Sequence, residues 1–164
     1  MLAAVSLVGL VAGCSTAGPG PDPRSLDPSA TSTPISDGGV RVVLRFGDDS
    51  AEATLADTPP ARRFAALLPL SLDLRDPLGQ AKAGPLPRPI ELGSDVRPVF
   101  DPAAGQIYYS APSQTFAIFY VDLGQSIPDP GLVRLGSVDT GLDRIAEAGN
   151  RFPVRIDVAD GSAS

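Results

Sequence analysis

The sequence contains no histidine, no tryptophan, one cysteine and one lysine among its 164 residues. Without histidine, the chain cannot form the serine–histidine or cysteine–histidine pairs of nucleophilic enzymes. Zinc sites built on histidine and cysteine are excluded for the same reason. A single cysteine also excludes a disulfide within the chain. We therefore expect neither a metal nor a cofactor.

Positive charge is scarce as well. The 13 basic and 19 acidic residues give a formal net charge of -6. Binding to nucleic acid requires a basic surface that neutralises phosphates, so we expect no nucleic-acid partner. The same acidity disfavours electrostatic attachment to anionic lipid.

The N-terminus resembles the signal of a bacterial lipoprotein over residues 1–13. Residues 2–12 are uncharged and mostly apolar, but this run is shorter than the roughly twenty residues needed to span a bilayer. The tetrapeptide Val-Ala-Gly-Cys that ends at Cys14 resembles the lipobox, in which the cysteine is lipidated and the chain is cut before it. This implies a lipid anchor at Cys14 as the chain's contact with the membrane, on the extracytoplasmic face of a bacterial cell membrane. The alternative is a buried helix with a chance cysteine. No basic residue precedes the run, so we expect the natural chain to start upstream.

Composition divides the rest of the chain into a tether, a domain and a tail. Residues 15–38 are rich in Pro, Ser, Thr and Gly, and such a segment buries too little apolar surface to fold. We expect a disordered tether over residues 14–38, one domain over residues 39–160 and a disordered tail over residues 161–164.

Hydrophobic alternation within residues 39–160 predicts many short strands. We expect two short helices, one that is capped by Asp57 or Thr58 and ends at Pro69, and one over residues 141–148. The strands are expected at residues 40–46, 51–55, 70–74, 88–92, 105–109, 115–120, 132–139 and 152–158. Such a set predicts a mainly β fold that closes into a barrel, because closure removes exposed strand edges.

Three segments resemble the bacterial cyclophilin-like fold family. They are residues 61–70, which end in Leu-Leu-Pro-Leu, residues 105–120, which end in Ala-Ile-Phe-Tyr, and residues 135–148, which resemble the last strand and helix of cyclophilins. The resemblance implies a closed cyclophilin-like β-barrel with two short capping helices. Family members are short, often lipoproteins, and mostly without an assigned activity.

The resemblance implies less about catalysis. Cyclophilin prolyl isomerases use an arginine in a groove lined with aromatics, a glutamine, a tryptophan and a histidine. This chain lacks the last two and carries Leu-Val-Arg at residues 132–134 where the isomerases carry histidine. Isomerisation requires no proton transfer, so a weak or degenerate isomerase, or a folding helper, stays the alternative to a non-catalytic domain.

Five of the nine aromatic residues fall between Tyr108 and Tyr120. We interpret Tyr109, Pro112 and Phe116 as a shallow groove that binds an extended peptide, with core packing as the alternative. The expected function is a cell-surface lipoprotein module that binds a peptide, a protein or a small ligand, without catalysis.

The remaining charged groups are expected to be solvated. The acidic pairs Asp48 with Asp49 and Asp73 with Asp76 fall beside turn residues. Lys82 is expected in a loop. Arg62 and Arg63, at the start of the first helix, are expected to be exposed and solvated, with an anion site as the alternative.

Overall fold

The computed structural model describes residues 38–122 and 124–159. The predicted signal, Cys14, most of the tether and the tail lie outside these residues. The described part of the chain contains eight strands and two helices, in the order β1 (Val40–Phe46), β2 (Asp49–Leu55), α1 (Pro59–Ala65), β3 (Leu70–Arg75), β4 (Ala81–Pro85), β5 (Gln106–Ser110), β6 (Thr115–Phe119), β7 (Val133–Thr140), α2 (Leu142–Glu147) and β8 (Arg151–Val158).

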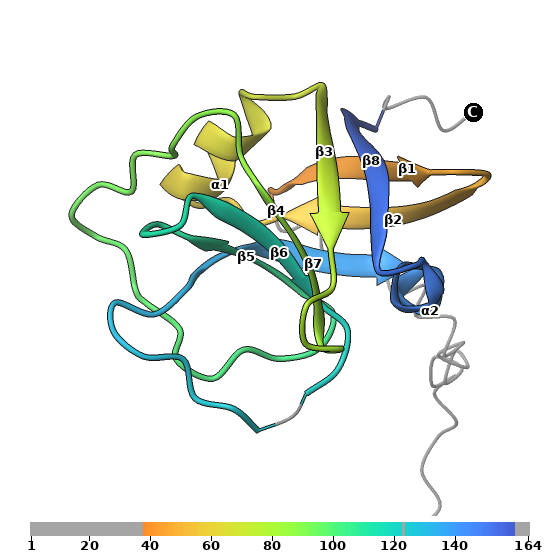
Figure 1. The fold of residues 1–164 in the computed structure, drawn as a ribbon. Coiled ribbons are helices and arrows are strands. Elements are labelled where there is room, and N and C mark those ends of the chain that lie inside the picture. The colour runs from red at the N-terminus through yellow and green to blue at the C-terminus, as the bar shows by residue number, and fades with distance from the viewer. Residues whose placement is uncertain (1–37, 123, 160–164) are drawn as a thin grey trace, which may run out of the picture. The chain divides into compact units, whose positions relative to one another are not determined.

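The strands form a closed antiparallel barrel, as predicted. Their order around the barrel is β1-β2-β7-β5-β6-β4-β3-β8 (Figure 1). β1 and β2 form a hairpin in which Val42 pairs with Ala53 and Leu44 with Ala51. These four side chains are buried, because alternate residues of a strand face the same side.

Residues on both faces of β5 and β6 are buried, which explains the density of aromatics there. Tyr109 and Phe116 belong to the main core, whereas Tyr108 and Phe119 belong to a second, smaller cluster. The rings of Tyr108 and Phe119 meet edge to face, with centroids 5.5 Å apart. Long connections that include Val99 cover this second cluster.

The helices close the barrel through single large side chains. Phe64 of α1 is fully buried and stacks on Phe116, with ring centroids 5.2 Å apart. Ile145 has the same role in α2. Thr58 is the N-cap of α1 by position, as expected, although its side chain makes no capping hydrogen bond.

Two strand predictions were wrong. Residues 88–92 are not a strand, since prolines at 87 and 89 interrupt them, and the missing strand is β4. The sequence of β4, Ala-Lys-Ala-Gly-Pro, contains no β-branched residue. Its strand character comes from its neighbours: β4 pairs with β6 throughout, and a Cβ on Gly84 would lie 2.6 Å from the carbonyl oxygen of Asp73 in β3. Val158, the last residue of β8, is half exposed.

Candidate functional site

Tyr109, Pro112 and Phe116, which were expected to form a shallow groove, do not lie together at the surface. Tyr109 and Phe116 are each 1% exposed, and both rings pack in the barrel core. Pro112 is exposed in the turn between β5 and β6. The two rings therefore form no surface groove with Pro112, and their surroundings match the core-packing alternative.

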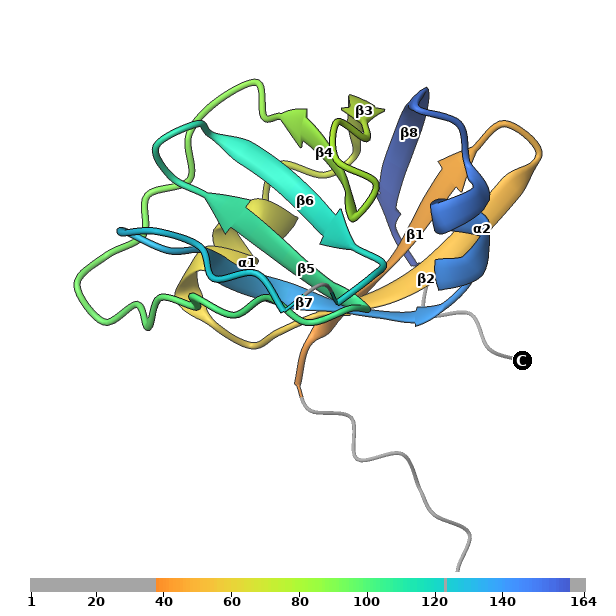
Figure 2. The ribbon, with the colours of Figure 1, turned by 60° about the horizontal axis from the view of Figure 1, so that its bottom comes forward.

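A cleft does lie beside α1, where the long connection between β4 and β5 passes. Figures 1 and 2 show this connection on the same side of the barrel as the helix. We name the cavity the α1 cleft; its volume is about 620 Å³. Its apolar lining comes from the start of α1, the connection and the start of β7: Pro59, Pro60, Leu92, Val96, Val99 and Val133.

Two anchors hold the connection against the barrel. The Tyr109 hydroxyl accepts a hydrogen bond of 3.1 Å from the buried N–H of Ile90. The N–H of Val99 donates to the Leu132 carbonyl over 2.7 Å, and the N–H of Leu132 donates back over 2.8 Å. Residues 91–98, between these anchors, form the outer edge of the cleft, and we call them the lip. Tyr109 is therefore not a lining residue of the α1 cleft. Its hydroxyl instead fixes the connection that carries the lip.

Three arginines are among the lining residues, one from each of the three segments that form the cleft. Arg63 comes from α1, Arg97 from the lip and Arg134 from β7. The Arg63 guanidinium donates to the Glu91 carbonyl, and Nε of Arg134 donates to the side-chain oxygen of Gln106. Among the described residues, none of the three arginines forms an ion pair with a carboxylate.

Three further polar residues line the cleft: Thr58, Ser94 and Asp95. Asp95 in the lip is the one acidic residue among the described lining residues. The hydroxyl oxygen of Thr58 is buried and has no hydrogen-bond partner in the described part of the chain. Three arginines and one aspartate leave the lining with an excess of positive charge, whereas the whole chain carries -6.

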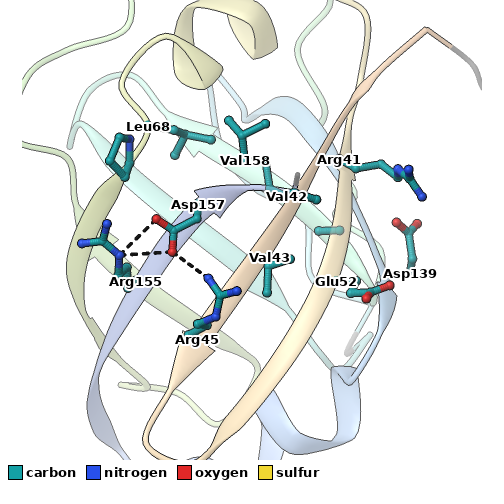
Figure 3. Close-up of a pocket in the computed structure, with 13 residues that line it drawn as sticks. Arg41, Val42, Val43, Arg45, Glu52, Leu68, Asp139, Arg155, Asp157 and Val158 are labelled. Carbon is teal, nitrogen blue, oxygen red and sulfur yellow. Dashed lines mark hydrogen bonds and ion pairs between the residues drawn. The ribbon is translucent and has the colours of Figure 1, made fainter. Parts of the chain in front are cut away.

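A second pocket, of about 840 Å³, lies against β1, β2 and β8 (Figure 3). Asp157 accepts hydrogen bonds there from Arg45 over 2.9 Å and from Arg155 over 3.0 Å. Three arginines and three carboxylates line this pocket, which we call the strand pocket, so its formal charges cancel. Two of its three arginines already bind a carboxylate of the same pocket. The strand pocket is therefore a weaker candidate for a ligand-binding site than the α1 cleft.

The buried charged cluster within the described residues is structural. Lys82 and Asp76 have side chains 2% and 5% exposed, with Nζ and Oδ2 2.9 Å apart. The Lys82 ammonium also donates to the Ala148 carbonyl over 2.7 Å, and the Tyr120 hydroxyl donates to Asp76 over 2.5 Å. Each polar group in the cluster is already bonded, and none lines either cavity described above. It therefore holds the ends of β6 and α2 against the turn between β3 and β4.

The cluster shifts two ionisation equilibria. Burial raises the pKa of Asp76, but the hydrogen bonds from Tyr120, Lys82 and Gly79 outweigh it, so this pKa lies below its ordinary value. Burial and the adjacent Asp76 carboxylate raise the pKa of Tyr120 to about 12. Asp76 does lie in the turn between β3 and β4 and accepts a hydrogen bond from the N–H of Gly79, as expected, but its side chain is buried and not solvated. The expectation that Lys82 lies in a loop was wrong, because Lys82 lies in β4. Asp73, by contrast, is exposed as expected.

Neither metal binding nor membrane crossing is indicated by the described residues. Within residues 38–122 and 124–159, no three His, Cys, Asp or Glu side chains gather as a metal site would require. No helix in those ranges has the length and hydropathy to cross a bilayer.

Comparison with known proteins supports the fold. The model of a family described as cyclophilin-like matches residues 44–157. The solution structure of a hypothetical protein from Archaeoglobus fulgidus is similar to this chain, with a TM-score of 0.58 and 15% sequence identity. The match covers 74% of this chain and 95% of the archaeal one. No curated protein matches the sequence.

Proposed function

The chain belongs to the cyclophilin-like family, and from this premise we propose that it is a lipid-anchored, extracytoplasmic module that binds a ligand in the α1 cleft without catalysing a reaction. The location rests on the sequence: the lipobox-like tetrapeptide that ends at Cys14 and the Pro- and Ser-rich tether behind it. Such a tether would hold the domain some 25–30 Å from the lipid surface.

The α1 cleft is the observation that carries the binding role. Pockets for small ligands are concave, mainly apolar and supplied with a few convergent polar groups. The cleft is lined by six apolar residues, by three arginines and by Thr58, Ser94 and Asp95. Its volume of about 620 Å³ lies within the ordinary range of such sites.

Methyl resonances test this proposal directly. The full chain, carrying Cys14→Ser so that it is not lipidated, is labelled at its valine methyls and titrated with octan-1-ol and with a blocked proline-containing tetrapeptide. We expect at least one probe to shift the methyls of Val96, Val99 and Val133, and to leave those of Val42 and Val154 in the core unchanged. Cleft methyls that stay unmoved with both probes and also with octanoate would count against the proposed function.

A matched pair of substitutions locates the site. Val96 in the lip and Val43 on β1 are both partly buried, and each lines one of the two cavities. We expect Val96→Asn to weaken binding of the active probe and Val43→Asn to leave it unchanged. The reverse result would transfer the function to the strand pocket.

A further inference from the structure

We infer that the ligand of the α1 cleft is a small molecule that joins an apolar body to a carboxylate. This inference rests on the proposed function and adds the chemistry of the ligand. The chain has more acidic than basic residues, yet three arginines without carboxylate partners in the described structure meet around one apolar cavity.

Four of the eight described arginines outside the cleft form ion pairs with carboxylates, namely Arg45, Arg62, Arg151 and Arg155. None of the three cleft arginines does so, and the Asp95 carboxylate, in the same lip as Arg97, forms no ion pair in the described part of the chain either. The lining therefore has a net positive charge that an external anion can neutralise.

Two of these guanidinium groups already have a hydrogen-bond partner within the chain. Arg63 is held by the Glu91 carbonyl and Arg134 by the Gln106 side chain. Each guanidinium has five N–H donors, so donors remain for a ligand oxygen. The planar arrangement of these donors suits a carboxylate, which can accept two parallel hydrogen bonds.

The rest of the ligand is defined by the lining between the arginines. Prolines 59 and 60, Leu92 and three valines offer apolar contact but few hydrogen bonds. Thr58 and Ser94 are the uncharged polar residues of this lining. A short aliphatic chain with a carboxylate at one end satisfies both parts of this surface, and the cavity volume fits a small molecule.

Three probes with the same chain length and different charge test the inference. Octanoate, octan-1-ol and octyltrimethylammonium are titrated against the full chain carrying Cys14→Ser, with the methyls of Val96, Val99 and Val133 as reporters. We expect octanoate to bind about tenfold more tightly than octan-1-ol, and the cation to bind more weakly than the alcohol, since charged hydrogen bonds are stronger. The octanoate affinity should fall with added salt, whereas the alcohol affinity should not.

Substitutions then assign the preference to the arginines. Arg97→Gln combined with Arg134→Gln should reduce the preference for octanoate over octan-1-ol to near unity. Both side chains are exposed, so the variant should fold, and the unchanged methyl spectrum of the core verifies this. Arg41→Gln, in the strand pocket, is the control and should keep the full preference.

The outcomes separate the inference from the proposed function. Equal binding of octanoate and octan-1-ol at the cleft methyls would overturn the carboxylate specificity and leave a neutral binding site. A preference that survives the double substitution would overturn the role of Arg97 and Arg134. No shift at these methyls with any of the three probes or with the tetrapeptide would refute the binding site as well.

Discussion

Nζ of Lys82 lies 2.9 Å from Oδ2 of Asp76, in a pair almost completely withdrawn from solvent. Lys82 is the single lysine of a chain whose other basic residues are arginines. Its ammonium also meets the carbonyl of Ala148, directly after α2, where a cation offsets the negative end of the helix. Through the bond to Ala148, Lys82 connects β4 to the end of α2, which is distant from β4 in sequence.

Removing one member of this pair should destabilise the fold strongly. In Lys82→Met, the Asp76 carboxylate keeps the hydrogen bonds of Tyr120 and Gly79 but loses its countercharge. We expect a loss of about 3–5 kcal/mol in the free energy of unfolding, measured by urea denaturation. Asp76→Asn should also destabilise, and the double variant should lose less than the sum. Additive losses would show that the two side chains do not interact.

The surface pair provides the control for this measurement. Arg62 and Asp57 are 2.7 Å apart but largely exposed. Solvent screens exposed ion pairs, so we expect Arg62→Met to change the unfolding midpoint far less than Lys82→Met. A comparable loss of stability in Arg62→Met and Lys82→Met would mean that burial of the ion pair does not determine its contribution.

Alkaline pH should weaken the same cluster through Tyr120. Its pKa is raised from 10.0 to about 12, so the folded state holds this proton more tightly than the unfolded state. The resulting stabilisation is complete below pH 10 and is lost as the pH rises towards about 12. We expect Tyr120→Phe to reduce the fall in stability over this range, measured by urea unfolding at several pH values. Identical pH profiles of the two proteins would contradict this assignment.

The pH dependence of stability that arises from Asp76 has the opposite sign. Its pKa is lowered from 3.8, so its stabilisation is present above that value and is lost at lower pH. Asp76→Asn, which cannot ionise, should therefore have a shallower loss of stability in acid.

The period-two pattern was enough to predict most of the barrel. β1 alternates between two faces, whereas β5 and β6 are short apolar runs on either side of a turn, and the limits of all three agree with the predicted ones within about a residue. β4 was missed because its conformation depends on pairing with β6 and on the close approach at Gly84. Neither feature can be recognised from the side-chain pattern of the β4 segment itself.

The polar groups were harder to place because the fold brings them together from distant segments. Lys82, Asp76 and Tyr120 come from three different segments, and the cleft arginines from α1, the lip and β7. A lone lysine between Ala81 and Ala83 was a usable signal for burial. No comparable signal marks the cleft, whose lip belongs to a connection without regular structure. The predictions for Cys14 and the tether stay predictions.

The position of the lip should depend on the Tyr109 hydroxyl. Tyr109→Phe leaves the ring in the core but removes the acceptor of the buried Ile90 N–H. An unpaired buried N–H costs about 1–3 kcal/mol, so we expect faster hydrogen exchange at Ile90 and weaker probe binding in the cleft. Tyr108→Phe is the matched control, since its hydroxyl accepts from Ala103 outside the lip. Equal effects of the two variants on binding would argue against this role.

Prolyl isomerisation should not be accelerated by this protein. None of the described residues that line the α1 cleft is aromatic, whereas the isomerases of the family bind proline in an aromatic groove. A protease-coupled assay on a proline tetrapeptide should give the uncatalysed rate at all protein concentrations. A rate that rises with protein and is lost in Arg134→Gln would instead favour the enzyme.

Lipidation at Cys14 should determine where the protein resides. In a bacterial host that processes lipoproteins, we expect mass spectrometry to find the mature chain starting at an acylated Cys14, in the membrane fraction. Several acyl chains are needed because one alone gives marginal and reversible membrane binding. Cys14→Ser should abolish acylation, whereas Ser15→Ala, which keeps the small residues before the cysteine, should not. An uncleaved N-terminus with a free thiol in the native material would refute the anchor, while the binding experiments on the barrel would keep their meaning.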